Sequence, residues 1–131
     1  MRKLLLLSIT FIIISCVKDN NGIILNFYNF PNPFHPETEN TKFRAILDLT
    51  GVSSFDWELK IYSEDSSTVY EASGSVGTPS SPFDILWAGR DNRGNIVKNG
   101  IYRSWLIIKV TKTTSGYSGD TYKADFYTVV K

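Results

Sequence analysis

The sequence predicts an all-β protein built as an antiparallel sandwich. Apolar and polar residues alternate in several segments, such as "FDWELKIY" at 55–62, and this period of two is typical of strands with one buried face. Turn-forming residues separate these segments, and no stretch has a helical period. About seven strands in roughly a hundred residues favour an immunoglobulin-like or fibronectin III-like sandwich, with a closed barrel as the alternative.

Each predicted strand brings apolar side chains to one face. Phe43 and Ala45 share a face of the second strand, and Tyr102 and Leu106 share a face of the sixth. Glycine, asparagine, aspartate and serine fill the connections, which is typical of turns. The predicted strands are residues 23–30, 42–49, 55–62, 67–73, 83–89, 101–110 and 121–130.

The chain opens with "MRKLLLLSITFIIISC", a charged start followed by a short apolar run. The run is shorter than the roughly 20 residues of a bilayer span, so it indicates a secretory signal peptide. Two aliphatic residues and a serine before Cys16 resemble the bacterial lipobox, which implies cleavage before Cys16 and its acylation with a fatty acid such as palmitate. The alternative is an ordinary signal peptide or short anchor with an incidental cysteine. We therefore divide the chain into a signal peptide (1–15), a lipidated tether (16–22) and one domain (23–131).

Composition and charge narrow the function classes. Hydrophobic residues make up 42% and aromatic residues 14%, which argues against disorder. Removing Arg2 and Lys3 with the signal peptide leaves 12 basic against 13 acidic residues, and no basic stripe predicts nucleic-acid binding. Cys16 is the single cysteine, so an internal disulfide is excluded. Val17 stands after it in place of an aspartate, which favours the outer membrane of a bacterial envelope.

The sequence offers no catalytic constellation. It has a single histidine, His35, and its single cysteine falls in the lipobox, so neither a Ser/His/Asp nor a Cys/His arrangement can be assembled convincingly. His35 has no partner histidine or cysteine as a metal ligand. We therefore expect no enzyme activity, no metal and no cofactor.

The stretch "NFPNPFHP" at 29–36 is interpreted as a structural element that ends a strand and bends the chain. Its prolines fix φ and donate no hydrogen bonds, so a regular strand cannot continue through them. We expect the chain to bend here at an edge of the sandwich. Phe30 and Phe34 are expected to lie between the two sheets and to cover one open end.

Two motifs resemble FlgD-type immunoglobulin-like domains, which occur in the flagellar hook-capping protein and, in related form, in type IX secretion sorting tails. They are "FPNPFHPETENTKFRAIL" and "ILWAGRDNRGNIVKNGIYRSWLII", and the resemblance runs from Phe30 to Lys131. The sequence departs from the family at Ala88, where Asp or Asn is usual, and at "SEDSSTVY", which replaces a glycine turn. The motif residues that we assign are Asn32, Pro33, Phe34, Trp87, Gly89, Asp91, Gly94, Gly100 and Tyr102.

These motif residues have structural explanations. Trp87 would fill the core, and Gly89 would let the backbone turn beside it. Asp91 would cap a tight loop in which Gly94 takes a positive φ, and Tyr102 could form a hydrogen bond through its hydroxyl. The motif therefore identifies a fold rather than an activity.

One feature points to a binding surface. Trp105 and Ile107 lie on the face of their strand opposite the core, and Tyr127 and Tyr62 point outward in the same way. If their strands are neighbours, these four residues form an apolar patch, which is typical of protein contacts or carbohydrate binding. The alternative is that the strand 23–30 covers them or that this sheet is buried on both faces.

The leading functional hypothesis is a non-enzymatic, lipid-anchored envelope protein. Its domain would serve as a structural or protein-interaction module with a protein partner in the envelope. A glycan-binding or adhesion module that uses the aromatic face is the first alternative. A sorting-tail-like domain of a secretion system is the second.

Overall fold

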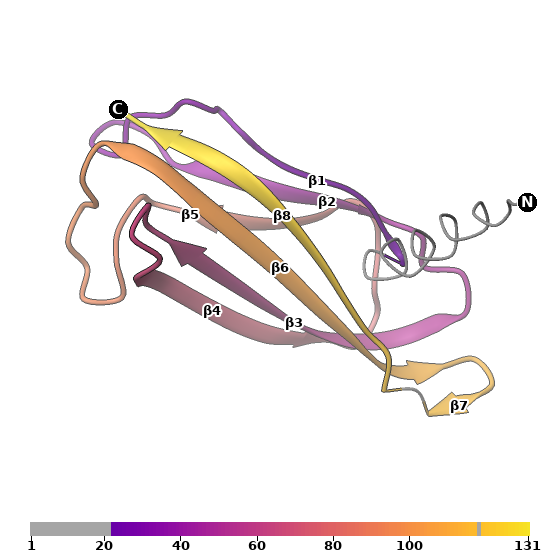
Figure 1. Ribbon diagram of the computed structural model, residues 1–131. Helices are drawn as coiled ribbons and strands as arrows, with labels where there is room; N and C mark the ends of the chain where they lie inside the picture. The colour runs from indigo at the N-terminus through magenta and orange to yellow at the C-terminus, as the bar shows by residue number, and fades with distance from the viewer. Residues whose placement is uncertain (1–21, 118) are drawn as a thin grey trace, which may run out of the picture.

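The computed structural model describes residues 22–117 and 119–131. The expected signal peptide (1–15), Cys16 and the tether as far as residue 21 lie outside the described residues. Two antiparallel sheets face each other, which confirms the predicted sandwich (Figure 1). One sheet has the order β1-β2-β5, formed by Ile24–Phe30, Thr41–Leu47 and Phe83–Trp87. The other contains β4 (Thr68–Val76), β3 (Val52–Tyr62), β6 (Gly100–Thr113), β7 (Gly116–Tyr117) and β8 (Thr121–Val130).

In the five-stranded sheet, β3 and β6 are central and β4 forms one edge. Both β7 and β8 pair with the other side of β6: β8 along residues 100–109 and the short β7 at Lys112 and Thr113. We predicted only a turn at 115–120. The structure instead lengthens β6 and folds Gly116–Tyr117 back on it as a hairpin, which projects from the sandwich (Figure 1).

Apolar side chains from both sheets fill the space between them, as their alternation predicts. The central side chain is Trp87, which is 1% exposed and is in contact with rings from both sheets. Its ring centroid lies 6.4 Å from that of Phe43 and 6.1 Å from that of Tyr102. The other buried apolar residues are Ile24, Phe27, Phe34, Ala45, Leu47, Phe55, Leu59, Ile61, Leu106, Ile108, Val110 and Val130.

The proline-rich stretch joins β1 to the free edge of β8. The Asn32 amide donates to the Tyr127 carbonyl at 2.9 Å and accepts the Val129 N–H at 2.9 Å. The Phe34 N–H then donates to the Val129 carbonyl at 3.0 Å, and the Lys131 N–H donates to the Phe34 carbonyl at 3.0 Å. Exposed strand edges invite pairing with other chains, and these bonds occupy the end of this one.

The two phenylalanines of this stretch separate. Phe34 is fully buried against Trp87, with ring centroids 5.7 Å apart, as expected. The expectation for Phe30 is wrong: it is 39% exposed on the outer face of its sheet, with the Arg44 guanidinium 5.2 Å from its ring centroid. Phe30 still belongs to β1, opposite Lys42, and the alternation of side chains sends it outward.

Asn29, the residue before Phe30, points into the core and belongs to a buried polar network. The Asn29 amide donates to the Thr41 hydroxyl at 2.9 Å and accepts the Thr128 hydroxyl at 3.0 Å. The Asn32 amide also donates to Asn29 Oδ1 at 3.2 Å. Because the Asn29 amide is paired, its burial is tolerated, and the network links β1, β2 and β8.

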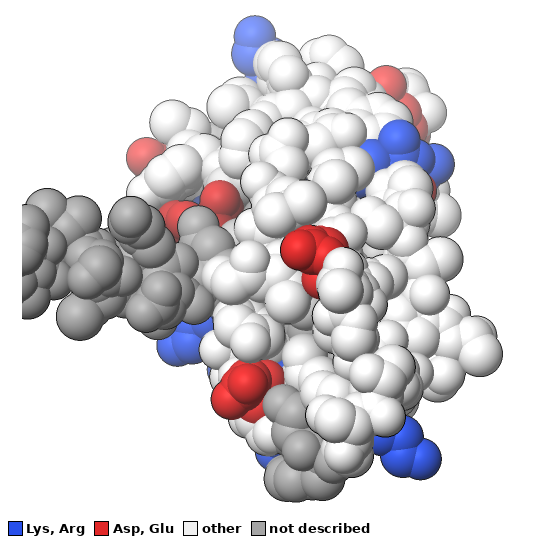
Figure 2. Space-filling view, turned by 90° about the vertical axis from the view of Figure 1, so that its right-hand side faces the viewer, with Lys and Arg blue, Asp and Glu red and all other residues white. Residues whose placement is uncertain are grey.

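The two ends of the sandwich carry different features. At one end, the Asp48 N–H donates to the Ile23 carbonyl and the Thr114 N–H donates to the Gly51 carbonyl, so the start of β1 lies at the same end as the β7 hairpin. The C-terminus lies at the opposite end (Figure 1). Figure 2 looks onto the end and side that hold the hairpin; its described acidic and basic side chains are scattered among neutral residues.

Candidate functional site

The loop after Trp87 positions the motif residues from "WAGRDNRGN". Trp87 Nε1 donates to the Arg90 carbonyl at 2.9 Å. Asp91 Oδ1 accepts the N–H groups of Arg93 at 2.9 Å and Asn95 at 3.0 Å. Gly89 and Gly94 have φ values of +72° and +91°. These residues thus lie in a turn that holds the indole, and they present no reactive group.

Tyr102 and Gly100 lie where the next strand begins. Gly100 is the first residue of β6, and the Tyr102 hydroxyl donates to the Lys98 carbonyl at 2.6 Å. Burial, with a smaller contribution from Glu64, raises the pKa of Tyr102 above its ordinary value. The phenol therefore stays protonated and keeps its hydrogen bond through the neutral range. Pro33, by contrast, is exposed within the turn that follows β1.

The residues of the expected binding face do lie on one face, the outer surface of the five-stranded sheet. Tyr62 is opposite Arg103 on β6, and Arg103 is opposite Tyr127 on β8. Trp105 lies in the next row of this face, between Lys60 and Asp125. Strand β1 pairs with β2 in the other sheet, so it does not cover these residues, and Tyr127 is 56% exposed.

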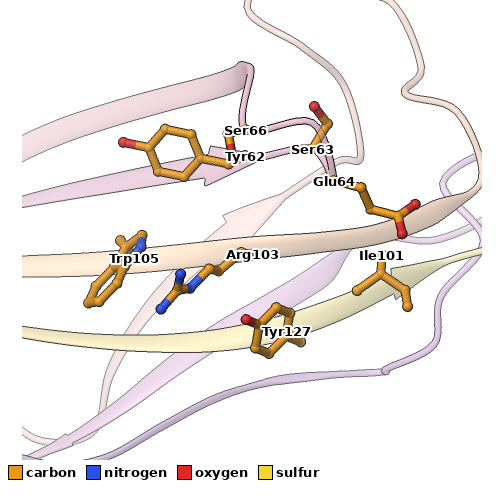
Figure 3. A pocket seen from close by; sticks show the side chains of 8 residues that line it. All are labelled: Tyr62, Ser63, Glu64, Ser66, Ile101, Arg103, Trp105 and Tyr127. Carbon is orange, nitrogen blue, oxygen red and sulfur yellow. The ribbon is translucent and has the colours of Figure 1, made fainter.

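A surface pocket of about 630 Å³ opens over this part of the sheet (Figure 3). Trp105 and Tyr127 lie on either side of Arg103, with the guanidinium carbon 4.7 Å from the Trp105 ring centroid and 5.8 Å from that of Tyr127. Arg103 Nε donates to Asp125 Oδ2 at 2.8 Å, and this bond raises the pKa of the guanidinium. The pocket is lined by Tyr62, Ser63, Glu64, Ser66, Ile101, Arg103, Trp105 and Tyr127.

This pocket, which we call the aromatic pocket, differs from the apolar patch that we expected. The Arg103 guanidinium lies between two of its rings, so the surface combines aromatic faces with a cation. Ile107 does not line the pocket: it lies in a further row of the sheet, opposite Glu58 and Lys123, beside a shallower hollow. The length of β6 explains this, because a strand of 14 residues extends across more than one surface feature.

Five residues that line the pocket were absent from the predicted face: Ser63, Glu64, Ser66, Ile101 and Arg103. Arg103 lies two residues before Trp105, so the period of two already placed both side chains on one face. Glu64 comes from the β3–β4 turn, whose position over β6 depends on strand register. In this turn Ser66 has φ +69°, a left-handed conformation that glycine adopts more readily. Ser66 belongs to "SEDSSTVY", the stretch that replaces the glycine turn expected from the FlgD-type resemblance.

The lining of the aromatic pocket is suited to binding. Its ring faces can stack on a planar or sugar-like group, and Arg103, Glu64 and the serine hydroxyls can form polar contacts. His35 lies elsewhere, with Nδ1 3.1 Å from the Lys131 carbonyl oxygen. Within residues 22–117 and 119–131, no group of three His, Cys, Asp or Glu side chains is arranged to hold a metal. The same residues contain no helix long and apolar enough to cross a bilayer.

Together the fold and these motif positions define an immunoglobulin-like β-sandwich domain. A solved structure similar to this chain is dimeric latent PorU from Porphyromonas gingivalis, with a TM-score of 0.60 and 22% sequence identity. The match covers 79% of this chain but 9% of the PorU chain, so it supports the domain fold. No protein-family model matches the sequence, and no curated protein matches it.

Proposed function

We propose that this protein is a non-enzymatic lipoprotein of the bacterial cell envelope, with a FlgD-type domain that binds an envelope protein through the aromatic pocket. The observation that carries the binding role is the outward-facing stack of half-buried Trp105 with exposed Arg103 and Tyr127. Aromatic and arginine side chains are enriched among residues that dominate binding energy at protein interfaces. The lipobox at Cys16 supports the anchor, and the two motifs support the relationship to FlgD-type domains.

The geometry of the domain agrees with a role away from the membrane. The start of β1 lies beside the β7 hairpin, whereas Ile101 and Tyr127 of the pocket lie near the C-terminal end, where Gly100 pairs with Val130. An anchor at Cys16 would attach through residues 17–22, which span at most about 22 Å when extended. The pocket would then face outward from the outer membrane, toward a partner.

The anchor is tested by labelling cells with radioactive palmitate. We expect the wild-type protein to incorporate label and to have an intact mass that begins at acylated Cys16. Cys16→Ala should abolish the label, whereas Ser15→Ala, which keeps a small residue before the cysteine, should retain it. Equal labelling of wild type and Cys16→Ala would refute lipid attachment, and the same mass measurement would reveal the C-terminal processing that a sorting-tail role requires.

Glycan binding is the second candidate, because three aromatic rings, a carboxylate and two serine hydroxyls line the same pocket. The two candidates differ in salt dependence. A protein partner recognised through Arg103 should bind less tightly as salt rises, whereas a neutral glycan stacked on the rings should be insensitive to salt.

Trp105→Ala tests the pocket itself. We expect binding of the envelope partner or of cell-surface polysaccharide to fall by at least about tenfold, because the largest ring of the pocket is removed. Ile107→Ala, on the same strand face but outside the pocket, should leave binding unchanged. Loss of the folded state in Trp105→Ala, seen by near-ultraviolet circular dichroism, would assign Trp105 a structural role instead.

A further inference from the structure

A second binding feature lies on the edge strand β4, apart from the aromatic pocket. Within the described residues β4 pairs only with β3, so its other side forms the edge of the five-stranded sheet. Asn92 shows which backbone groups point outward. Its side chain accepts the Glu71 N–H at 2.8 Å and donates to the Glu71 carbonyl at 3.1 Å, and its own N–H donates to the Val69 carbonyl at 3.2 Å.

Alternation along an antiparallel strand extends this pattern. Because Glu71 points both its N–H and its C=O away from β3, Ser73 and Ser75 do the same. In the described part of the chain, no strand or loop backbone bonds to these four groups. Asn92 occupies the edge as far as Glu71, and the free part therefore begins immediately after it.

This free edge lacks the usual protection against pairing. Natural edge strands carry charged residues, prolines or bulges. From Ala72 to Thr78 the sequence "ASGSVGT" has no charge and no proline. The edge of β8, by comparison, is bonded by Asn32 and Phe34. The last part of the β8 edge is thus bonded, whereas β4 after Glu71 presents an ordered edge that is unpaired within the described residues.

We infer that β4 is a strand-addition site for an extended segment of a partner polypeptide that alternates apolar and basic residues. An extended segment that adds a strand can bond all of these backbone groups at once. On the inner side, the Trp57 indole lies over Gly74, where a Cβ would be 2.8 Å from Nε1, and it offers a ring to an apolar side chain. On the outer side, Asp56 and Glu71 form no ion pair with a described residue, which favours basic side chains.

A second copy of this chain is a poorer occupant. Two β4 edges paired antiparallel about Gly74 would set Gly74 of one copy opposite Gly74 of the other, and Ser73 opposite Ser75. The Trp57 indole would then meet no apolar side chain across the new pairing, and the outer-face acids Asp56 and Glu71 would meet no basic one. Self-pairing therefore does not use the two features that favour a segment of alternating apolar and basic residues.

The test uses the full chain in mild detergent and a synthetic seven-residue peptide of alternating valine and lysine. We expect peptide binding to slow amide hydrogen exchange at Ser73 and Ser75 by at least about tenfold, because their N–H groups become bonded. Two peptides serve as controls: one with glutamate in place of lysine, and one with N-methyl groups on the backbone nitrogens that face β4. Neither should protect these amides.

Ser73→Pro tests the edge from the side of the protein. The substitution removes an N–H that points outward, so the β3–β4 ladder keeps its bonds, and proline is tolerated at such positions. Peptide affinity should fall at least about tenfold relative to Ser73→Ala, which retains the N–H. Should the proline variant unfold, the N-methylated peptide still decides the question.

Three outcomes would overturn the inference. These are the absence of protection at Ser73 and Ser75, equal binding of the N-methylated peptide, and a concentration-dependent dimer that Ser73→Pro abolishes. The last would assign the edge to self-association. Because the site does not involve Trp105 or Cys16, these outcomes leave the proposed function untouched.

Discussion

Replacing Trp87 with alanine is expected to lower the free energy of unfolding by about 3–5 kcal/mol, which is the usual cost of truncating a fully buried tryptophan. Trp87 is in contact with Phe34, Phe43 and Tyr102 from different parts of the sandwich, so neighbouring side chains cannot easily close the cavity. The Arg90 carbonyl also loses its indole donor. Urea unfolding monitored by circular dichroism measures the change.

Trp105→Ala is the matched control, because it makes the same truncation on the outer face of the sandwich. Trp105 is half-buried, and its ring forms a cation–π contact with the Arg103 guanidinium. Such a contact contributes about 0.5–1 kcal/mol at a solvent-exposed site. A change of less than about 1.5 kcal/mol is therefore expected. Comparable losses in the two variants would mean that Trp87 does not organise the core.

Much of this fold can be predicted from the sequence, because apolar and polar residues that alternate with a period of two indicate a strand with one buried face. A strand that buries one face must alternate, and β2 does so throughout, as does β6 from Tyr102 to Val110. In β3 the register shifts between Val52 and Phe55, and the burial pattern there does not alternate. The loop residues Asp91 and Gly94 were predictable for a similar reason. Both requirements are local, because Asp91 accepts the N–H of a residue four positions later and Gly94 takes a positive φ. The sequence of the loop is therefore enough to predict both roles.

The errors arise where the partner is distant. The sequence alone does not place Asn29, which is polar yet buried because Thr41 and Thr128 satisfy its amide in the core. Thr128 is 99 residues away, and only the folded topology brings it close. Phe30 was misplaced in the same way: its motif suggested a core role, but its register with Lys42 turns it outward.

The sequence predicted the face on which the candidate binding surface lies, but it did not predict all of the residues that form it. The alternation along each strand predicted that Trp105 and Tyr127 point away from the core. Only the pairing of β6 with β8 brings the two side chains together. The same adjacency puts Arg103, which is paired with Asp125, between their rings, and this adds a charged group to the expected apolar surface. The odd or even position of a residue in its strand thus predicts the sheet face on which it lies. The chemistry of the surface depends in addition on which strands pair.

Gly89→Ala is expected to be the second most damaging substitution, with a loss of about 3–4 kcal/mol that combines backbone strain and overlap. Gly89 has φ +72°, a conformation that costs a residue with a Cβ about 1–2 kcal/mol. An added Cβ would also overlap the Pro36 ring and lie 3.2 Å from Phe34 Cε2. Pro36 is rigid and Phe34 is fully buried, so neither side chain can move away easily.

Gly94→Ala separates these two causes. Gly94 lies in the same loop with φ +91°, but no atom lies within 4 Å of a Cβ built there. Its substitution should therefore cost only the backbone strain of about 1–2 kcal/mol. The difference between the two variants in urea unfolding measures the contact between the proline-rich stretch and the loop after Trp87. Equal losses would show that this contact relaxes freely, and that the close packing of the two motifs is not what requires glycine at position 89.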